Sequence, residues 1–395
     1  IVTNLFAALP LISETPDRTM LNFDPVTLPE SSEQLRPVIR DFIATNLPAG
    51  HRRNSDFTSG HAPEFSAALG AAGWLGMTIP TQYGGGGRGF FDRYVVTEEL
   101  LAAGAPVGAH WISDRQTAPL LLGHGSQAQR EFYLPQICSG TCYFSIGMSE
   151  PNAGSDLAAI RTTADRVDGG WRVNGTKLWT TGAHLNHYLM TLVRTSPPSE
   201  NRHAGMSQLI IDLNAEGVHV RPIDSMTGNS EFNEVVFTDV FVPDSALVGV
   251  EGNGWQQVTS ELGYERSGPE RFLSTFRVFL ELVRLVGRSP TGDQAAAVGR
   301  LASHLLSLRR MSLSVAGMLQ EGKMPNVEAA LVKDLGNRFE KLSLEIARLA
   351  APIDRDRQAF DQVLADSLLL SPSFSLRGGT SEILRGMIAR GLGLR

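Results

Sequence analysis

The chain has 395 residues, of which 42% are hydrophobic and 19% are charged, and its formal net charge is −6. This composition is that of a globular protein of two or three domains with enough residues to bury a stable core. It shows no basic patch for a nucleic acid, so no nucleic-acid partner is expected.

Residues 1–29 are expected to form an N-terminal extension. The apolar opening at residues 1–12 is too short to span a bilayer and lacks the positively charged start of a signal peptide, so no membrane association is expected. Met20 is the expected beginning of the folded protein, and whether residues 1–19 are native stays open.

Residues 30–144 are predicted to be a helical domain, because apolar residues recur three and four positions apart in segments such as 65–73 and 95–101. The glycine-rich run 84–89 has the spacing of a dinucleotide-binding loop. However, it follows a helical segment and opens no strand-turn-helix unit, so a Rossmann site is not predicted. Cys138 and Cys142 have the spacing of neither a redox pair nor a zinc site, and they are expected to be reduced thiols of a cytoplasmic protein.

Residues 145–253 are predicted to be a β domain. Asp-Gly at 168–169 and Asn-Gly at 174–175 are turn signals on either side of a short strand. Further strands are predicted at 188–193, 208–212, 218–221 and 234–241, ended by Pro-Asp at 243–244. His184 and His187 have no third ligand at a suitable spacing, so they are expected to be surface or loop histidines, and no metal site is predicted.

Residues 254–395 are predicted to return to long helices, at 255–264, 272–286, 295–320 and 327–350. The predicted order is therefore a helical domain, a β domain and a helical bundle.

Two motifs far apart in the chain carry the functional signal. The first is Ser-Glu-Pro-Asn-Ala-Gly-Ser-Asp at 149–156, followed by Asn-Gly-Thr-Lys-Leu-Trp-Thr-Thr-Gly at 174–182, and the second is Gly-Gly-Thr-Ser-Glu-Ile at 378–383. Together they resemble the FAD-dependent acyl-CoA dehydrogenases, and the resemblance covers residues 30–390. It implies an α+β fold with an N-terminal helical domain, a middle β-barrel-like domain and a C-terminal four-helix bundle. It also implies α,β-desaturation of an acyl-CoA thioester, with FAD as cofactor and an electron-transfer flavoprotein as electron acceptor.

A flavin ring needs polar donors at its pyrimidine edge and at its hydride-accepting nitrogen, and an apolar or aromatic wall behind it. The resemblance implies that the backbone of Met148 and Ser149, together with the Ser149 hydroxyl, meets the pyrimidine edge. Trp179 would form the wall, and Thr181 would contact the hydride-accepting nitrogen.

The phosphate end of FAD needs closely approaching backbone. By resemblance, Ser155 approaches the pyrophosphate and also the substrate, and Gly154 binds the cofactor. Thr380 and Glu382 begin a helix whose free amides would form an anion site for the flavin diphosphate or adenosine. A simple capped helix is the plainer alternative, and both can hold.

Desaturation requires a carboxylate that removes the weakly acidic proton beside the thioester carbonyl. The family's usual carboxylate stands just before Gly379, where this chain has Gly378. Members without it carry a glutamate before an arginine on the first long helix after the β domain, and the distance from Gly254 to Glu265 matches that pattern. Glu265 is therefore the predicted base, and the absence of a side chain at Gly378 leaves space for it.

Three neighbouring residues complete the predicted catalytic region. Glu270 is the rival base, but on a continuous helix it points about 140° away from Glu265. It also stands four residues after Arg266, so a solvated or ion-paired carboxylate is predicted there. Arg266 either pairs locally or, as the resemblance implies, binds the CoA moiety, with neither favoured. The resemblance also implies that a backbone amide of the C-terminal loop, at Gly379, holds the thioester oxygen together with a flavin ribityl hydroxyl.

The chain departs from the family in two stretches that normally reach a neighbour's FAD. Regions 281–290 and 345–354 lack the Arg-x-x-Phe-Gly and Gln-x-x-Gly-Gly-x-Gly patterns. A second acyl-CoA dehydrogenase-like chain is therefore expected to supply these contacts in a hetero-oligomer. The alternative is that Arg284 or Arg288 is a displaced substitute in a homotetramer.

These departures and the helix-borne base resemble the heteromeric acyl-CoA dehydrogenases of bacterial steroid side-chain degradation, which implies a bulky or branched acyl group. Two other functions stay open. One is a non-catalytic partner subunit of a heteromeric dehydrogenase, and the other is a flavin monooxygenase or nitroalkane oxidase of the same fold.

Overall fold

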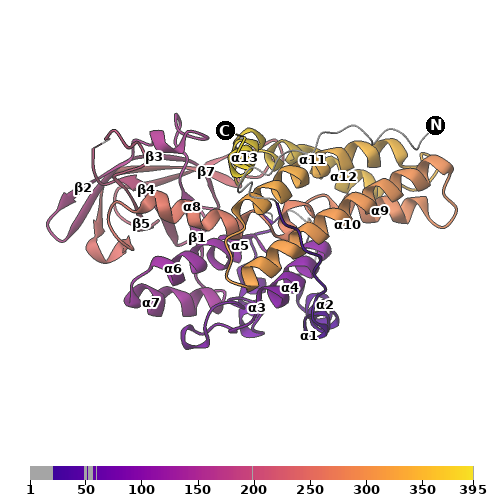
Figure 1. Ribbon diagram of the computed structural model, residues 1–395, viewed down its shortest axis with the longest axis horizontal. Helices are drawn as coiled ribbons and strands as arrows, with labels where there is room; N and C mark the ends of the chain where they lie inside the picture. Colours follow the sequence, from indigo (N-terminus) through magenta and orange to yellow (C-terminus); the bar gives the residue numbers. More distant parts are fainter. Residues whose placement is uncertain (1–20, 49–50, 52–56, 59, 198, 395) are drawn as a thin grey trace, which may run out of the picture.

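The computed structural model describes residues 21–48, 51, 57–58, 60–197 and 199–394, and the side chains of residues 261–265 fall outside that set. Residues 1–20 of the expected extension 1–29, with Met20 among them, also lie outside it. In the described chain a β-sheet and a helical bundle lie side by side, and the N-terminal helices pack beneath both (Figure 1).

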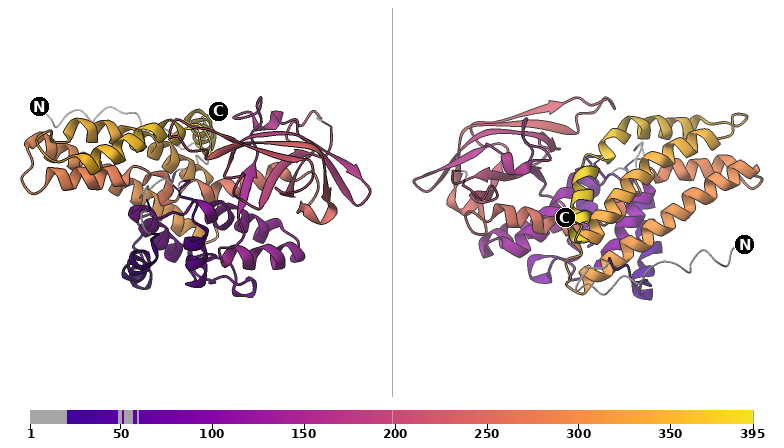
Figure 2. Two further views of the ribbon diagram at one scale, coloured as in Figure 1. Left: turned by 180° about the vertical axis from the view of Figure 1, so that it is seen from behind. Right: turned by 45° about the horizontal axis from the view of Figure 1, so that its top comes forward.

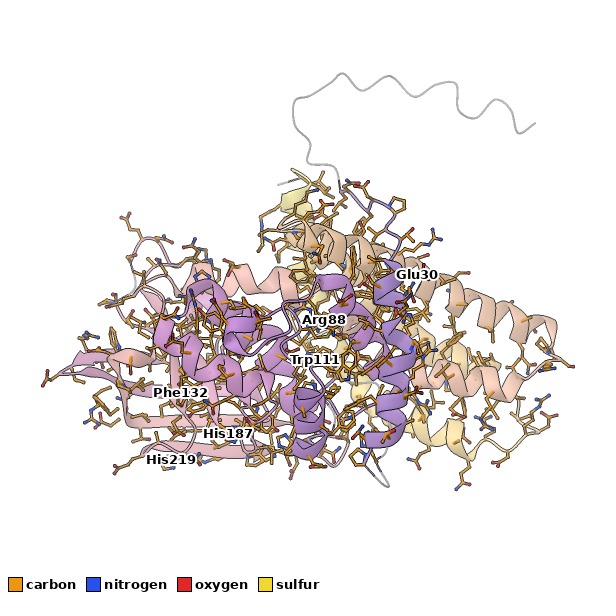
Figure 3. All side chains as sticks on the ribbon, turned by 90° about the horizontal axis from the view of Figure 1, so that it is seen from below. Glu30, Arg88, Trp111, Phe132, His187 and His219 are labelled. Atoms are coloured by element: carbon orange, nitrogen blue, oxygen red, sulfur yellow. The ribbon has the colours of Figure 1, made fainter. Side chains whose placement is uncertain are left out.

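The N-terminal region is helical, as predicted. Its α-helices are α1 (Glu30–Glu33), α2 (Leu35–Asn46), α3 (Pro63–Ala71), α4 (Phe90–Ala103), α5 (Gly108–Ile112), α6 (Ala118–His124) and α7 (Gln127–Cys138). A π-helical turn η2 (Ser113–Thr117) joins α5 to α6, and a 3-10 turn η1 (Thr81–Tyr83) precedes the glycine-rich run 84–89. Seen from below, these helices cover the junction between sheet and bundle (Figure 3).

The middle region forms one sheet. Its strands are β1 (Phe144–Gly147), β2 (Thr163–Val167), β3 (Gly170–Thr181), β4 (Tyr188–Arg194), β5 (Met206–Asp212), β6 (Val218–Ile223), β7 (Phe232–Pro243) and β8 (Leu247–Val248). The spatial order is β6-β7-β3-β2-β4-β5-β8, and β1 pairs with β4 in parallel. The two longest strands, β3 and β7, pair with each other, and β3 also pairs with β2, so β3 is held on both sides.

Strand β3 differs from its prediction in length. Asn-Gly at 174–175 was expected to be a turn, but the strand continues through it for 12 residues. The β3–β7 register shifts between Val173 and Gly175, where Gly175 has φ +148°, and again between Lys177 and Thr180. The Asn-Gly pair therefore marks a β-bulge. Glycine allows the backbone conformation that the bulge requires, and the strand continues beyond it.

The C-terminal region is helical, as predicted. Its α-helices are α8 (Gly254–Glu265), α9 (Phe276–Val286), α10 (Gly292–Gln320), α11 (Asn326–Ala350), α12 (Gln358–Phe374) and α13 (Ser381–Gly391). The helix expected at 272–286 begins only at Phe276, because the 3-10 turn η5 (Pro269–Arg271) and four non-helical residues precede it. Helix α12 was not among the predicted helices. Two further views show α9 to α12 running together away from the sheet (Figure 2).

Two groups of buried side chains position the site. The largest core joins N-terminal helices to the bundle, and includes Phe65 and Trp111 together with Leu282 and Phe360. A small cluster, which includes Ala153, Met206 and Val258, ties the loop of the first motif to the sheet and to α8. No helix in the described part of the chain is both long enough and apolar enough to cross a membrane.

Candidate active site

A buried ion pair fixes the bend in which the first motif begins. Lys177 on β3 is fully buried, and its Nζ lies 2.8 Å from Glu150 Oε1 and donates to the Met148 carbonyl at 3.1 Å. The Glu150 carboxylate also accepts the backbone N–H groups of Arg161 at 2.7 Å and Thr162 at 3.0 Å. The peptide groups expected at the flavin's pyrimidine edge are thus anchored to the centre of the sheet.

Both partners of this pair are charged at neutral pH. Burial acts to raise the pKa of the Glu150 carboxyl, but the charge and hydrogen bond of Lys177, together with hydrogen bonds from Thr162 and Arg161, outweigh it and hold that pKa below its usual range. Burial lowers the pKa of Lys177 to about 8. Neither residue was predicted from the sequence to have a role, although both lie within the two segments of the flavin-type motif.

The predicted phosphate-side residues lie at the surface. Gly154 and Ser155 are exposed, whereas Ser149, which is predicted at the pyrimidine edge, is half-buried. No atom lies within 4 Å of the position that a Cβ on Gly154 would occupy. A ligand can therefore approach this backbone closely.

Trp179 has a backbone conformation that few non-glycine residues adopt. Its φ is +61°, and it sits in the second β3 bulge, between Lys177 and Thr180. The indole is 58% exposed, with an edge contact to Phe232 at a centroid distance of 6.1 Å. Bulges of this kind re-aim a side chain, and here the bulge presents a large apolar ring outward.

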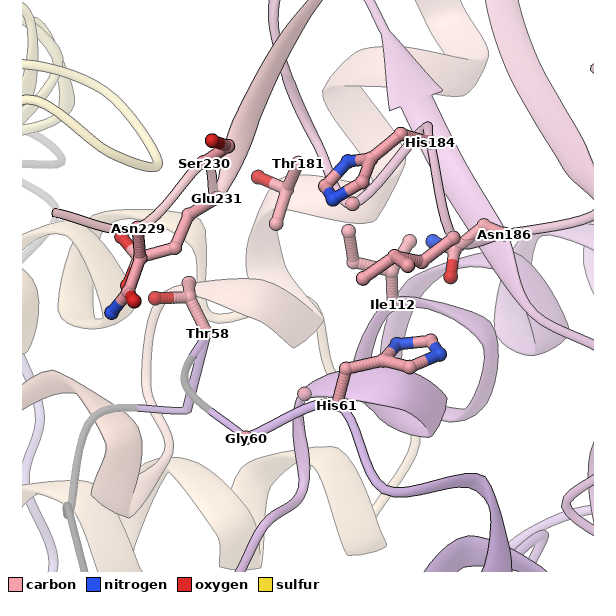
Figure 4. A pocket seen from close by; sticks show the side chains of 13 residues that line it. Thr58, Gly60, His61, Ile112, Thr181, His184, Asn186, Asn229, Ser230 and Glu231 are labelled. Carbon is pink, nitrogen blue, oxygen red and sulfur yellow. The ribbon is translucent and has the colours of Figure 1, made fainter. Parts of the chain in front are cut away.

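Thr181, two residues further on, borders a cavity of about 300 Å³ between the N-terminal helices and the sheet (Figure 4). One wall comes from the segment before α3 and from α5, with His61 and Ile112. The other comes from the β3–β4 and β6–β7 connections, with His184 and Glu231. The volume is at the lower end of that of small-molecule sites.

The C-terminal loop is tied to the end of α8. Gly378 and Gly379 have φ +63° and +98°, which glycine adopts without strain. The buried Arg266 donates from Nε to the Gly378 carbonyl at 3.0 Å, and its Nη1 lies 3.0 Å from the sulfur of Met387 on α13. Arg266 is thus engaged within the chain, and its predicted contact with CoA stays a prediction.

Glu265 is the last residue of α8, and Arg266 is the C-cap. The backbone of Glu265 therefore lies next to the residue that holds Gly378. The side chain of Glu265 is outside the described set, so its role as base stays a prediction.

The expected geometry of Glu270 is wrong. Helix α8 ends at Glu265, and the separate 3-10 turn η5 begins at Pro269. A continuous helix through this segment is disfavoured at Gly268, because the residue before a proline avoids the helical conformation. Glu270 is 2% exposed, and its carboxylate oxygens lie 3.8 Å from Arg115 Nη2 and from Arg271 Nε. It is an ion-paired carboxylate, but it is buried and it is not paired with Arg266.

Helix α13 begins with a side-chain cap. The Thr380 hydroxyl accepts the N–H of Ile383 at 3.4 Å. Hydrogen bonds from its own backbone N–H and from Thr380 hold the pKa of the exposed Glu382 below its usual range. The capped-helix prediction is confirmed, and the anion site stays a prediction.

These features fit a flavin. FAD requires an aromatic wall, a polar contact and a close approach at its phosphate end. The exposed indole can supply the wall, the threonine at the cavity can supply the polar contact, and the open backbone near Gly154 allows the approach. Ser149, Trp179 and Thr181 are the residues that would hold the ring.

The two departing regions each cover a helix end and the residues after it. Arg284, on α9, donates to Glu281 at 2.7 Å and is exposed, and region 345–354 covers the end of α11 and the residues after it. Among the residues that the structure describes, no group of three or more His, Cys, Asp or Glu side chains could hold a metal. Burial raises the pKa values of the free thiols Cys138 and Cys142 to about 12, which keeps them protonated.

Comparisons with known proteins agree with this geometry. Residues 29–141 match the family model "Acyl-CoA dehydrogenase, N-terminal domain", and residues 145–240 match "Acyl-CoA dehydrogenase, middle domain". Acyl-CoA dehydrogenase FadE26 of Mycobacterium tuberculosis is 36% identical over 393 residues, which covers 91% of this chain and 96% of FadE26. Acyl-CoA dehydrogenase IpdE1 of the same organism is 32% identical, covering 92% of this chain and 97% of IpdE1.

Solved structures give the same result. The Tcur3481-Tcur3483 steroid ACAD has a TM-score of 0.82 at 27% identity, covering 93% of this chain and 97% of the solved one. The ChsE4-ChsE5 complex of Mycobacterium tuberculosis has a TM-score of 0.81 at 28% identity, covering 94% and 99%. Members of this family are flavoproteins. The chain belongs to the acyl-CoA dehydrogenase family, and it is an oxidoreductase.

Proposed function

We propose that this chain is the FAD-binding, base-carrying subunit of an acyl-CoA dehydrogenase that removes a proton and a hydride from adjacent carbons of an acyl-CoA thioester. The hydrogen bond from Arg266 to the Gly378 carbonyl, 3.0 Å long, carries this proposal. It joins the end of α8, where Glu265 stands, to the loop in which the family's carboxylate is normally found. A base that has moved from the loop to the helix would act at the same place.

Each residue then has one role. Glu265 takes the proton from the carbon beside the thioester carbonyl. The Gly379 amide donates to the thioester oxygen, which stabilises the negative charge that develops there. When bound, FAD accepts the hydride from the neighbouring carbon. Trp179 and Thr181 orient the ring, and an electron-transfer flavoprotein is the proposed electron acceptor.

The proposed acyl group is bulky or branched. Gly378 contributes no side chain to the region that the substrate would enter, which supports a wide site. One solved relative is described as a steroid ACAD, which also supports a bulky acyl group.

The proposed assembly is a hetero-oligomer with a second chain of the same fold. Two family stretches that reach a neighbour's FAD are absent, and the two solved relatives are named as pairs of chains. Large apolar side chains are also left exposed on the C-terminal helices and loops, namely Leu349 at 74%, Ile353 at 88% and Leu376 at 64%. A partner chain would cover such groups.

The assembly is tested by purifying this chain alone and together with the neighbouring dehydrogenase gene product, then measuring mass in solution and flavin per polypeptide. We expect stoichiometric, tightly held FAD only with the partner. A homotetramer that holds FAD and turns over acyl-CoA unaided would overturn the hetero-oligomer.

The base is tested by anaerobic reduction of the bound flavin with a panel of acyl-CoA thioesters. Glu265→Gln should keep the flavin but slow its reduction by about 10²- to 10⁴-fold, since that is the usual contribution of a general base. This loss corresponds to about 3–5 kcal/mol of barrier. Glu270→Gln, checked for folding, is the control and should reduce the flavin at a rate within about tenfold of the wild type.

Three outcomes separate the alternatives. Near wild-type reduction in Glu265→Gln, with loss in a folded Glu270→Gln, would make Glu270 the base. Flavin that no thioester bleaches, in the presence of the partner, would indicate a non-catalytic subunit. A requirement for a separate flavin reductant would indicate a monooxygenase.

A further inference from the structure

One peptide group of the C-terminal loop can accept from Arg266 and donate to a substrate at the same time. The Gly378 carbonyl, which accepts from Arg266 Nε at 3.0 Å, and the Gly379 N–H belong to the same planar peptide bond. In a trans peptide these two groups point in opposite directions, so whatever holds the carbonyl also sets the direction of the N–H. Hydrogen bonds in a chain polarise one another, and a cationic donor on the carbonyl therefore makes the Gly379 N–H a stronger donor.

This peptide needs a second anchor. It lies between two glycines with φ +63° and +98°, and glycine gives the backbone on either side wide conformational freedom. A single hydrogen bond to the carbonyl does not by itself fix the orientation of the peptide plane. On the C-terminal side, Thr380 caps α13, the helix that lies where the sheet and the bundle meet (Figure 1). On the N-terminal side, the residue directly before Gly378 is Arg377.

The guanidinium of Arg377 is held by two buried groups of the bundle. Its Nη2 donates to the Ser274 hydroxyl at 2.7 Å and lies 3.9 Å from Glu340 Oε2. Ser274 is 3% exposed and Glu340 is 1% exposed. These two residues are themselves joined, since the Ser274 N–H donates to Glu340 Oε1 at 2.9 Å. The side chain that precedes the loop is therefore fixed to α11 and to the segment before α9.

Aromatic rings complete this anchor. The guanidinium carbon of Arg377 lies 4.5 Å from the ring centroid of Phe57 and 5.0 Å from that of Phe374 on α12. Both rings are buried, and Phe57 stacks on Trp111 of α5 at a centroid distance of 5.0 Å. A cation over an aromatic ring is attracted to it, and the attraction is larger where water is excluded. Arg377 thus joins the loop to the N-terminal region as well as to the bundle.

We propose that Arg377 is a positioning residue for the activation of the thioester. Its anchored side chain holds the backbone before Gly378, and Arg266 holds the Gly378 carbonyl, so that together they direct the Gly379 N–H. The inference rests on the proposed function, in which this N–H stabilises the negative charge that develops on the thioester oxygen. It adds a residue that acts through the loop backbone, since its guanidinium contacts buried residues of the core.

The test compares ligands that differ only in the group that the Gly379 N–H would bind. Octanoyl-CoA and cyclohexylpropanoyl-CoA are each paired with the thioether in which CH₂ replaces the carbonyl. Dissociation constants are measured by calorimetry on the FAD-loaded protein, with its partner chain where FAD loading requires one. The flavin is reduced with dithionite beforehand, so that the thioester is not consumed. In the wild type, each thioester should bind about 2- to 12-fold more tightly than its thioether, the effect of one hydrogen bond.

Arg377→Met should bring this affinity ratio close to one while leaving thioether binding within about twofold and the flavin content unchanged. With oxidised flavin, it should also slow flavin reduction at saturating thioester by about 10²-fold. This is the lower end of the effect of removing one oxyanion donor, because the N–H is misdirected and not removed. Arg377→Lys keeps a cationic donor and should recover part of the affinity ratio and part of the reduction rate.

Arg357→Met is the matched control. Arg357 also pairs with a carboxylate, that of Asp361 at 2.8 Å, and its guanidinium carbon also lies over a phenylalanine ring, that of Phe360 at 5.6 Å. It stands at the other end of α12, which has 17 residues and is about 25 Å long, so it is remote from the loop. This variant should keep the wild-type affinity ratio and reduction rate.

Ser274→Ala is a milder variant that replaces Arg377→Met if the latter does not fold. It removes the hydroxyl that accepts from Arg377 and keeps the backbone N–H that donates to Glu340. The affinity ratio of this variant should fall below that of the wild type.

The outcomes keep the inference and the proposed function apart. If thioesters reduce the wild-type flavin but the wild type shows no preference for the thioester over the thioether, the positioning role is overturned and the proposed function stands. The same conclusion follows if Arg377→Met, or Ser274→Ala in its place, weakens the binding of thioester and thioether equally. If no thioester reduces the wild-type flavin in the presence of the partner, the proposed function is overturned and the inference is overturned with it.

Discussion

Replacing Lys177 by methionine tests the ion pair that anchors the flavin-type bend. Methionine preserves most of the buried length but leaves the carboxylate of Glu150, which is 9% exposed, without its cation. Removing one partner of a buried pair costs about 3–5 kcal/mol. The carboxylate keeps its hydrogen bonds of 2.7 and 3.0 Å from two backbone N–H groups, so the lower end of that range is expected.

Protonation of Glu150 sets an upper bound on this loss. In the variant, burial without a cation raises the folded-state pKa above the ordinary 4.5. At pH 7 the Glu150 carboxylate of the folded variant can instead bind a proton. This costs about 1.36 kcal/mol for each pH unit above 4.5, which is about 3.4 kcal/mol in total. Because the folded state then binds more protons than the unfolded state, stability is lost as pH rises. The penalty should shrink to about 1 kcal/mol near pH 5.

Urea unfolding of the flavin-free protein, repeated between about pH 5 and pH 7, measures this difference. Glu150→Gln combined with Lys177→Met is the control, because no buried charge remains. The two backbone N–H groups donate to different oxygens of the wild-type carboxylate, so the single amide oxygen can accept one of them. The double variant should lose about 1–3 kcal/mol, the cost of one unmatched buried N–H group, and this loss should not change between about pH 5 and pH 7. A single-variant loss below about 1 kcal/mol at pH 7, or a loss that does not change with pH, would refute the reasoning.

Substitutions at Arg266 and at Gly378 probe the loop beside α8. Arg266→Met should lower the free energy of unfolding by about 1.5–3 kcal/mol, the value of a hydrogen bond from a charged group, and should slow flavin reduction. Arg266→Lys keeps the charge and should recover part of the stability and part of the rate of flavin reduction. If Arg266→Met is as stable as the wild type, the role of this hydrogen bond is contradicted. Gly378→Glu should weaken substrate binding, because a second carboxylate would repel Glu265 and because φ is +63° there. Adding Glu265→Gly should restore part of the turnover of straight-chain thioesters, and full activity of Gly378→Glu alone on the native substrate would count against a crowded site.

The order of the three regions could be predicted because hydrophobic periodicity reports local structure. The bulges of β3 could not be predicted, because an Asn-Gly pair fits a hairpin turn and a bulge equally well. Only the pairing of β3 with β7 decides between them. The break after Glu265 was missed for a similar reason. The spacing of Glu265, Arg266 and Glu270 was interpreted as one helix, although Pro269 was already a signal against it.

The candidate site was predictable where it rests on contiguous motifs. Ser149, Trp179 and Thr181 were identified from their segments, and the structure places Thr181 at a cavity. The cavity's histidines come from segments more than a hundred residues apart, and no spacing rule connects them. The partners of Lys177 and Arg266 likewise depend on long-range packing, which a single sequence does not record.

The backbone of Trp179 has a consequence for how this protein would evolve in the laboratory. A left-handed conformation at a residue with a side chain costs about 1–2 kcal/mol, which glycine largely avoids. A library selected only for heat resistance without cofactor should therefore enrich glycine at this position, whereas selection that retains flavin should keep the indole. The residue enriched at position 179 would therefore show whether a library had been selected for folding or for flavin-dependent catalysis.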